Sequence, residues 1–170
     1  MQWLALVGQD RAGSADPRAK AITQTVSALG AVFGCLLGAW LGRFGRRPAY
    51  FILCVLALAV TSYLFRVTRF YDLEFFLCVL LAGGFTGAFY GWLPLYLPEL
   101  FPTRVRATAQ GLSYNTGRVL AGFGALQTGT LVEKLGGSYE RAGATIVLVY
   151  FVGMVTIWFA PETRGQPLPE

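Results

Sequence analysis

The stretch from residue 98 to residue 118, PELFPTRVRATAQGLSYNTGR, decides how the rest of the chain is interpreted. It begins as a short charged turn and continues into a long apolar segment that carries amide side chains and Arg118. Charged and amide side chains inside a membrane span are costly, and they usually face protein or water rather than lipid. We therefore expect a charged turn at a membrane boundary, followed by a helix with one polar face.

The composition favours an integral membrane protein. Hydrophobic residues make up 55% of the 170 residues and charged residues only 14%, whereas an ordinary soluble domain has about 25% charged residues. The chain has no histidine, and its three cysteines stand singly in apolar runs, so the sequence predicts no metal site, no cofactor and no enzyme activity. The net charge of +5 comes from arginines scattered over several loops, which argues against a nucleic-acid partner.

Five apolar segments approach the length needed to cross a bilayer, which is about 20 helical residues. They predict an all-α membrane protein with about five transmembrane helices, at residues 21–41, 49–65, 75–97, 105–132 and 142–159. Residues 1–20 are expected to form a loop with an apolar patch that is too short to span. Residues 21–160 would then form the transmembrane domain, and residues 161–170 a tail.

Glycines recur at intervals of four residues in two of the predicted spans. On a helix this spacing forms a ridge without side chains, which lets a neighbouring backbone approach closely. We expect the ridges to serve helix packing rather than solute binding. The glycines expected to pack are Gly30, Gly34, Gly38, Gly83, Gly87 and, in the fourth span, Gly117.

The fourth predicted span has a small, polar face opposite a bulky, apolar face. Arg118 on the polar face is the only charged side chain well inside a predicted span. It could bind a solute carboxylate, tie helix ends together or extend to the membrane surface. No predicted span contains an aspartate or glutamate, so a proton-coupling carboxylate would have to lie elsewhere. The candidate solute contacts are Gln110, Tyr114, Asn115 and Arg118, with Tyr90 and Trp92 near the end of the third span.

Three motifs resemble those of the major facilitator superfamily, in its sugar-porter and metabolite–proton symporter branches. They are GRFGRRP at residues 42–48, PELFPTRVRATAQG at residues 98–111 and PETRG at residues 161–165. The resemblance implies that the five spans correspond to helices eight to twelve of a twelve-helix transporter. It implies symporter-like transport of a small polar solute, a sugar or an organic acid, by alternating access. The chain would be the C-terminal portion of such a transporter, from a truncated frame or a fragment, and inactive alone.

The same resemblance implies a cytoplasmic gate made of charged residues at the helix ends. Arginines of the first motif would pair with acidic residues of the other two, and would exchange partners between conformations. The simpler interpretation is that the arginines bind lipid headgroups. The gate candidates are Arg43, Arg46, Arg47, Glu99, Arg104, Arg106, Glu162 and Arg164. One departure from the family pattern is Gly42, which stands where the first motif usually carries an acidic residue.

The resemblance also sets the expected location and partners. We expect a multi-pass protein of the bacterial inner membrane with a cytoplasmic C-terminus. The expected partners are membrane lipids, a small polar solute bound together with a missing N-terminal half, and a complementing transporter half. The alternative is a small helical scaffold protein that forms homo-oligomers through its glycine ridges.

Overall fold

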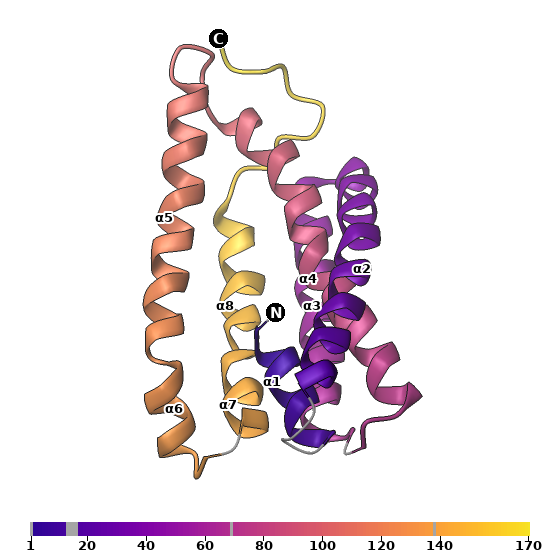
Figure 1. The fold of residues 1–170 in the computed structure, drawn as a ribbon. Coiled ribbons are helices and arrows are strands. Elements are labelled where there is room, and N and C mark those ends of the chain that lie inside the picture. Colours follow the sequence, from indigo (N-terminus) through magenta and orange to yellow (C-terminus); the bar gives the residue numbers. More distant parts are fainter. Residues whose placement is uncertain (1, 13–16, 69, 138) are drawn as a thin grey trace.

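The computed structural model describes residues 2–12, 17–68, 70–137 and 139–170, and within these ranges the regular structure is helical throughout. Long helices run side by side along the molecule, and α5 stands at one edge of the bundle (Figure 1). The main helices are α1 (Gln2–Arg11), α2 (Pro17–Leu41), α3 (Arg46–Arg66), α4 (Leu73–Leu100), α5 (Arg106–Leu126), α6 (Thr128–Lys134), α7 (Tyr139–Ile146) and α8 (Val149–Thr156). Two short 3-10 helices, η1 (Gly42–Phe44) and η2 (Ile157–Phe159), follow α2 and α8.

The all-helical membrane class predicted from the sequence is confirmed. Among the described residues, four helical segments are long and apolar enough to cross a membrane: Arg18–Phe44, Arg46–Arg66, Leu73–Leu100 and Tyr139–Phe159. The segment predicted as a span at residues 105–132 does not meet these criteria. Its amides and arginines lower its hydropathy, and the helix is interrupted at Gln127, between α5 and α6.

The expected loop at residues 1–20 is wrong for most of its length, because Gln2–Arg11 form α1 and α2 already begins at Pro17. Proline is favoured in the first turn of a helix, where its missing N–H costs nothing. Leu4 and Val7 of the apolar patch are buried against side chains of α3 and α4. Tertiary packing therefore orders a segment that is too short and too polar to be predicted as a helix by itself.

The glycine ridge of α2 packs against α4 within the same chain. A Cβ atom added at Gly34 would overlap the carbonyl oxygen of Gly84, and one added at Gly38 would overlap that of Ala88. Added Cβ atoms at Gly30, Gly83 and Gly87 would likewise meet the facing helix at less than van der Waals distance. Because α4 covers this ridge, the structure gives no support for oligomers formed through it. Gly117 differs, because nothing lies within 4 Å of the position its Cβ would take.

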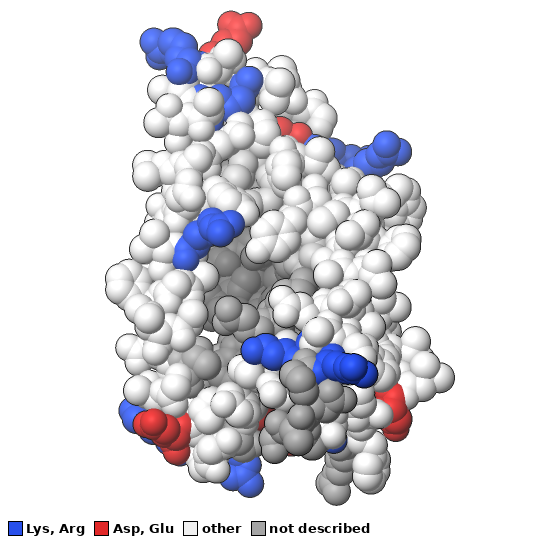
Figure 2. Space-filling model, viewed as in Figure 1, with Lys and Arg blue, Asp and Glu red and all other residues white. Residues whose placement is uncertain are grey.

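Two clusters of buried side chains hold the bundle at its opposite ends. One joins α1, α3, α4 and the turn after α7, and includes Leu4, Leu64 and Phe75. The other joins α3, α4 and η2, and includes Leu53, Trp92 and Ile157. Figure 2 shows uncharged surface over most of the visible face, with the charged side chains in a few separate groups. The second cluster lies next to the charged motifs and supports them.

Candidate functional site

The first motif and the end of α4 are joined by a two-point ion pair. The Arg46 side chain donates from Nε to Glu99 Oε2 at 2.8 Å and from Nη2 to Glu99 Oε1 at 2.5 Å. Only 14% of the Arg46 side chain and 19% of the Glu99 side chain are exposed. Parallel guanidinium–carboxylate bonds of this kind are among the stronger polar contacts in proteins. Thr163 of the tail also donates to Glu99 Oε2, at 2.6 Å, so three segments meet at one carboxylate.

The tail carboxylate of Glu162 caps the start of α3. It accepts hydrogen bonds from the backbone N–H groups of Arg46 at 2.8 Å and Arg47 at 3.0 Å. These N–H groups have no partner within the helix, and they form the positive end of its dipole. The sequence predicted that Glu162 would pair with arginine side chains, and the hydrogen bonds in the structure run to their backbone instead.

The environment of Glu162 changes its proton affinity. Burial raises the pKa of its carboxyl, but hydrogen bonds from the backbone N–H groups of Arg47, Arg46 and Arg164 outweigh burial and hold the pKa below its ordinary value. Glu162 is therefore charged at neutral pH, which suits its position at the positive end of α3.

Two aromatic side chains of α4 tie the same corner together. Trp92 Nε1 donates to the carbonyl oxygen of Arg46 at 3.0 Å, and Tyr96 Oη donates to that of Pro161 at 2.8 Å. Trp92 is buried here, with only 2% of its surface exposed, so the structure does not bring it to the surface that carries the other candidate solute contacts. The sequence indicated neither these roles nor that of Thr163, because none of these residues is charged.

The remaining gate candidates make only backbone contacts or none. Arg47 Nε donates to the Ala160 carbonyl, Arg164 Nη1 to the Phe44 carbonyl, and Arg106 to the Phe101 and Pro169 carbonyls. Arg43 and Arg104 are exposed, and neither side chain makes an ion pair or hydrogen bond to the described part of the chain. Among the eight gate candidates, the ion pair present is therefore Arg46–Glu99.

The candidate solute contacts of α5 border an open cleft between α4 and α5. This cleft has a volume of about 490 Å³, and Tyr90, Gln110 and Tyr114 are among the residues that line it. Arg118 lies next to Tyr114, with its guanidinium 5.6 Å from the ring centroid and Nη1 3.4 Å from the hydroxyl oxygen. Asn115 instead donates to the carbonyl oxygen of Gly111 on its own helix, at 2.8 Å.

α5 has no buried residue within the described chain, and the Arg118 side chain has no acidic partner there. A guanidinium paired only with an aromatic ring keeps its capacity to bind a carboxylate. The polar face of α5 therefore borders the open cleft toward α4, and no described helix covers it.

A buried arginine that the sequence did not indicate lies in the first helix. Only 4% of the Arg11 side chain is exposed, and its Nε and Nη2 donate to Glu140 Oε1 at 3.0 and 2.8 Å. Arg11 also donates to Thr68 Oγ1 at 2.6 Å, and its guanidinium lies 5.1 Å from the ring centroid of Phe75. The sequence did not predict a role for Arg11, because this residue falls in the expected loop. The pattern that could have predicted the ion pair is an arginine that follows an apolar patch, together with a glutamate at the start of the last span.

The structure is that of a multi-pass helical membrane protein. Polar contacts connect its helix ends at two places, around Glu99 and Glu162 and at the Arg11–Glu140 ion pair. A profile described as Major Facilitator Superfamily matches residues 13–170 of the chain. The chain belongs to this superfamily.

Proteins similar to the chain carry the names of transport proteins. The chain is 34% identical over 147 residues to a putative metabolite transport protein of Haemophilus influenzae, covering 81% of this chain and 34% of that protein. It is 32% identical over 145 residues to a probable 4-methylmuconolactone transporter of Cupriavidus pinatubonensis, covering 85% and 33%. A glycine betaine/proline/ectoine/pipecolic acid transporter of Dickeya dadantii is 31% identical over 135 residues, covering 78% and 26%. The chain thus spans about a third or less of the length of these relatives. No solved structure matches it significantly.

Proposed function

We propose that the chain forms one wall of the solute pathway of a facilitator-superfamily transporter, and that the solute carries a carboxylate. The observation that carries this proposal is Arg118, an exposed guanidinium on the polar face of α5 with no acidic partner in the described chain. A guanidinium beside a tyrosine hydroxyl forms charge-assisted hydrogen bonds to a carboxylate, and these are worth about 1.5–3 kcal/mol each.

The solute names of the relatives support a carboxylate. Glycine betaine and proline, in the name of the Dickeya relative, carry this group. So does cis,cis-muconate, in the name of a transport protein of Acinetobacter baylyi that is 30% identical to the chain over 147 residues. A sugar, the other solute class that the sequence favoured, would leave Arg118 without a partner of opposite charge. We therefore propose an organic acid or a zwitterionic amino-acid derivative rather than a sugar.

The open face of α5 supports the proposal that further helices complete the pathway. An amphipathic helix in a membrane protein turns its polar face toward protein or water. The helices that would cover Arg118 lie outside these 170 residues, which fits the share of the relatives that the chain spans. Under this proposal the long helices correspond to the last helices of the twelve-helix fold, and the tail lies on the cytoplasmic side.

The contacts of Glu99 and Glu162 support a clamp rather than a moving gate. Arg46, Thr163 and the first turn of α3 all belong to the same chain as these two carboxylates. We propose that they hold the ends of α3, α4 and the tail as one unit during transport. Arg43, Arg104, Arg106 and Arg164 remain the candidates for contacts that change partner between conformations.

The test is a chimera in which residues 17–170 replace the aligned third of the Cupriavidus 4-methylmuconolactone transporter, assayed by uptake in cells. Arg118→Gln is expected to raise the KM for carboxylate solutes by about 10- to 150-fold, from the loss of one charge-assisted bond. Arg66→Gln, which removes an exposed arginine from the end of α3, is the control and leaves KM unchanged. An unchanged KM in the Arg118→Gln chimera would refute the carboxylate assignment. The unfused chain in proteoliposomes is expected to give no uptake.

A further inference from the structure

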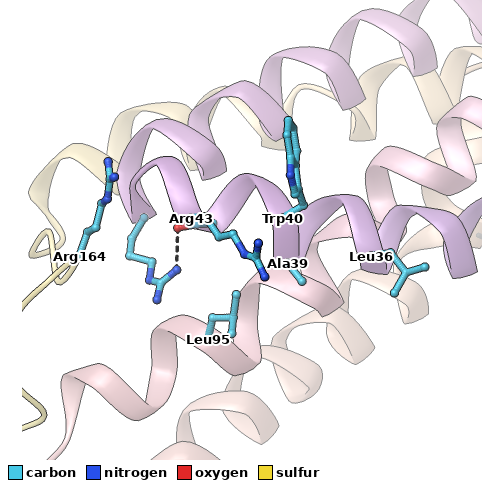
Figure 3. A pocket seen from close by; sticks show the side chains of 8 residues that line it. Leu36, Ala39, Trp40, Arg43, Leu95 and Arg164 are labelled. Carbon is cyan, nitrogen blue, oxygen red and sulfur yellow. Dashed lines mark hydrogen bonds between the residues drawn. The ribbon is translucent and has the colours of Figure 1, made fainter.

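A cationic pocket lies beside the turn between α2 and α3, and none of its lining residues belongs to α5. Its volume is about 510 Å³, and its walls come from the end of α2, η1, the start of α3, α4 and the tail (Figure 3). Arg43, Arg46 and Arg164 line it together with the apolar side chains of Leu36, Trp40 and Leu95. The pocket thus combines a charged part with an apolar wall.

The arginines around this pocket outnumber the carboxylates. Arg43, Arg46, Arg47 and Arg164 carry four positive charges, and Glu99 and Glu162 carry two negative charges, so the net charge is +2. Both carboxylates are engaged, Glu99 by Arg46 and Glu162 by the first N–H groups of α3.

Three guanidinium groups therefore have no acidic partner. Arg47 donates to the Ala160 carbonyl and does not line the pocket, which leaves Arg43 and Arg164 beside it. Arg43 makes no ion pair with any described residue, and the guanidinium of Arg164 donates to the carbonyl oxygen of Phe44. Gly42 in the pocket wall has no side chain that could supply a further acid. The pocket therefore carries an excess of positive charge, which favours an anion.

The pocket lies where a membrane surface should be. α2 and α3 belong to adjacent candidate membrane spans, so the turn that joins them emerges at one face of the bilayer. Trp40 and Phe44 are 52% and 58% exposed, with their rings edge to face at 4.9 Å between centroids. Exposed aromatic rings at the end of a span are typical of the headgroup region.

We propose that this pocket binds an anionic phospholipid of the surrounding bilayer. The guanidinium groups of Arg43 and Arg164 hold the headgroup phosphate, and an acyl chain follows the apolar wall past Leu36 and Leu95 toward the centre of the span. A free phosphate ion would satisfy the arginines but not the apolar wall, and basic pockets between membrane helices select lipid headgroups on the same principle.

The proposal is tested with the full chain in dodecyl maltoside, titrated with phosphatidylglycerol and followed by native mass spectrometry. The double variant Arg43→Gln/Arg164→Gln is expected to raise the dissociation constant about 10- to 30-fold. The control is Arg66→Gln/Arg104→Gln, which removes the same charge from exposed positions outside the pocket. The control is expected to change the dissociation constant less than about twofold.

Gly42→Asp is a second variant, which introduces a carboxylate into the pocket. Its Cβ would lie 3.1 Å from Arg46 Nη1 and 3.1 Å from Leu95 Cδ1, both at the ends of flexible side chains. It is expected to weaken phosphatidylglycerol binding as much as the double variant does. Equal weakening in the pocket and control double variants would overturn the proposal, because surface charge alone would explain it. Displacement of the lipid by inorganic phosphate at equal concentration would overturn the lipid assignment.

Discussion

The close approach of α2 and α4 can be tested by adding a single methyl group at Gly34. The facing atom is the backbone carbonyl oxygen of Gly84, which cannot rotate away because it belongs to a helix. α2 and α4 would have to separate by on the order of 1 Å, which loosens contacts along the whole ridge. Overpacking of this kind costs about 1–3 kcal/mol, and the rigid obstacle places Gly34→Ala near the upper end.

The matched control is Gly117→Ala, the same substitution in a helix where the added Cβ meets nothing within 4 Å. Replacing glycine by alanine inside a helix stabilises it by about 0.5–1 kcal/mol, and this gain is common to both variants. The difference between the two variants therefore measures the packing term alone. We expect Gly34→Ala to be less stable than Gly117→Ala by about 3 kcal/mol.

The measurement is unfolding in mixed micelles of dodecyl maltoside and SDS, followed by tryptophan fluorescence. Gly84→Ala is a third variant on the same interface. Its Cβ would lie 3.4 Å from the Gly30 carbonyl oxygen, an ordinary contact, so we expect little loss of stability. Equal stabilities for Gly34→Ala and Gly117→Ala would refute the close approach of the two helices.

Three further predictions concern the polar contacts at the helix ends. Glu99→Gln leaves the largely buried Arg46 without its counter-ion and should lower the free energy of unfolding by about 1–3 kcal/mol, measured by the same unfolding titration. Because the pKa of Glu162 is lowered from 4.5, its contribution is present at neutral pH and is lost as the pH falls through the lowered value. The difference in melting temperature between wild type and Glu162→Gln should therefore disappear in acid. Substituting Arg11 with Met or Glu140 with Gln should destabilise the chain, and the double variant should cost less than the sum, which a double-mutant cycle measures.

The sequence predicted the three long helices α2, α3 and α4 with small errors at their ends. The predicted spans 21–41, 49–65 and 75–97 lie within Pro17–Leu41, Arg46–Arg66 and Leu73–Leu100. Long apolar runs identify such helices, because lipid requires a helical backbone. The predicted ends fall short by at most four residues, because polar residues continue a helix once its apolar part has formed.

The errors arise where tertiary contacts decide the structure. α1 is ordered by burial of Leu4 and Val7 and by the Arg11–Glu140 ion pair, and the sequence does not show these partners to be close. The sequence also indicated that Glu162 belongs to the charged corner, but it could not distinguish an arginine side chain from the backbone N–H of the same arginine as its partner. Side-chain type can be read from the sequence, whereas the position of each atom depends on the packing of helices that lie far apart along the chain.

The cap of α3 also has a consequence for the order in which the chain assembles during synthesis. The carboxylate that caps Arg46 lies 116 residues later in the chain. At about 5–20 residues per second, roughly 6–23 s pass between the synthesis of Arg46 and that of Glu162. During this interval the N–H groups at the start of α3 depend on water, on lipid phosphate or on the insertion machinery. This corner of the protein is therefore completed only after the ribosome has made α8.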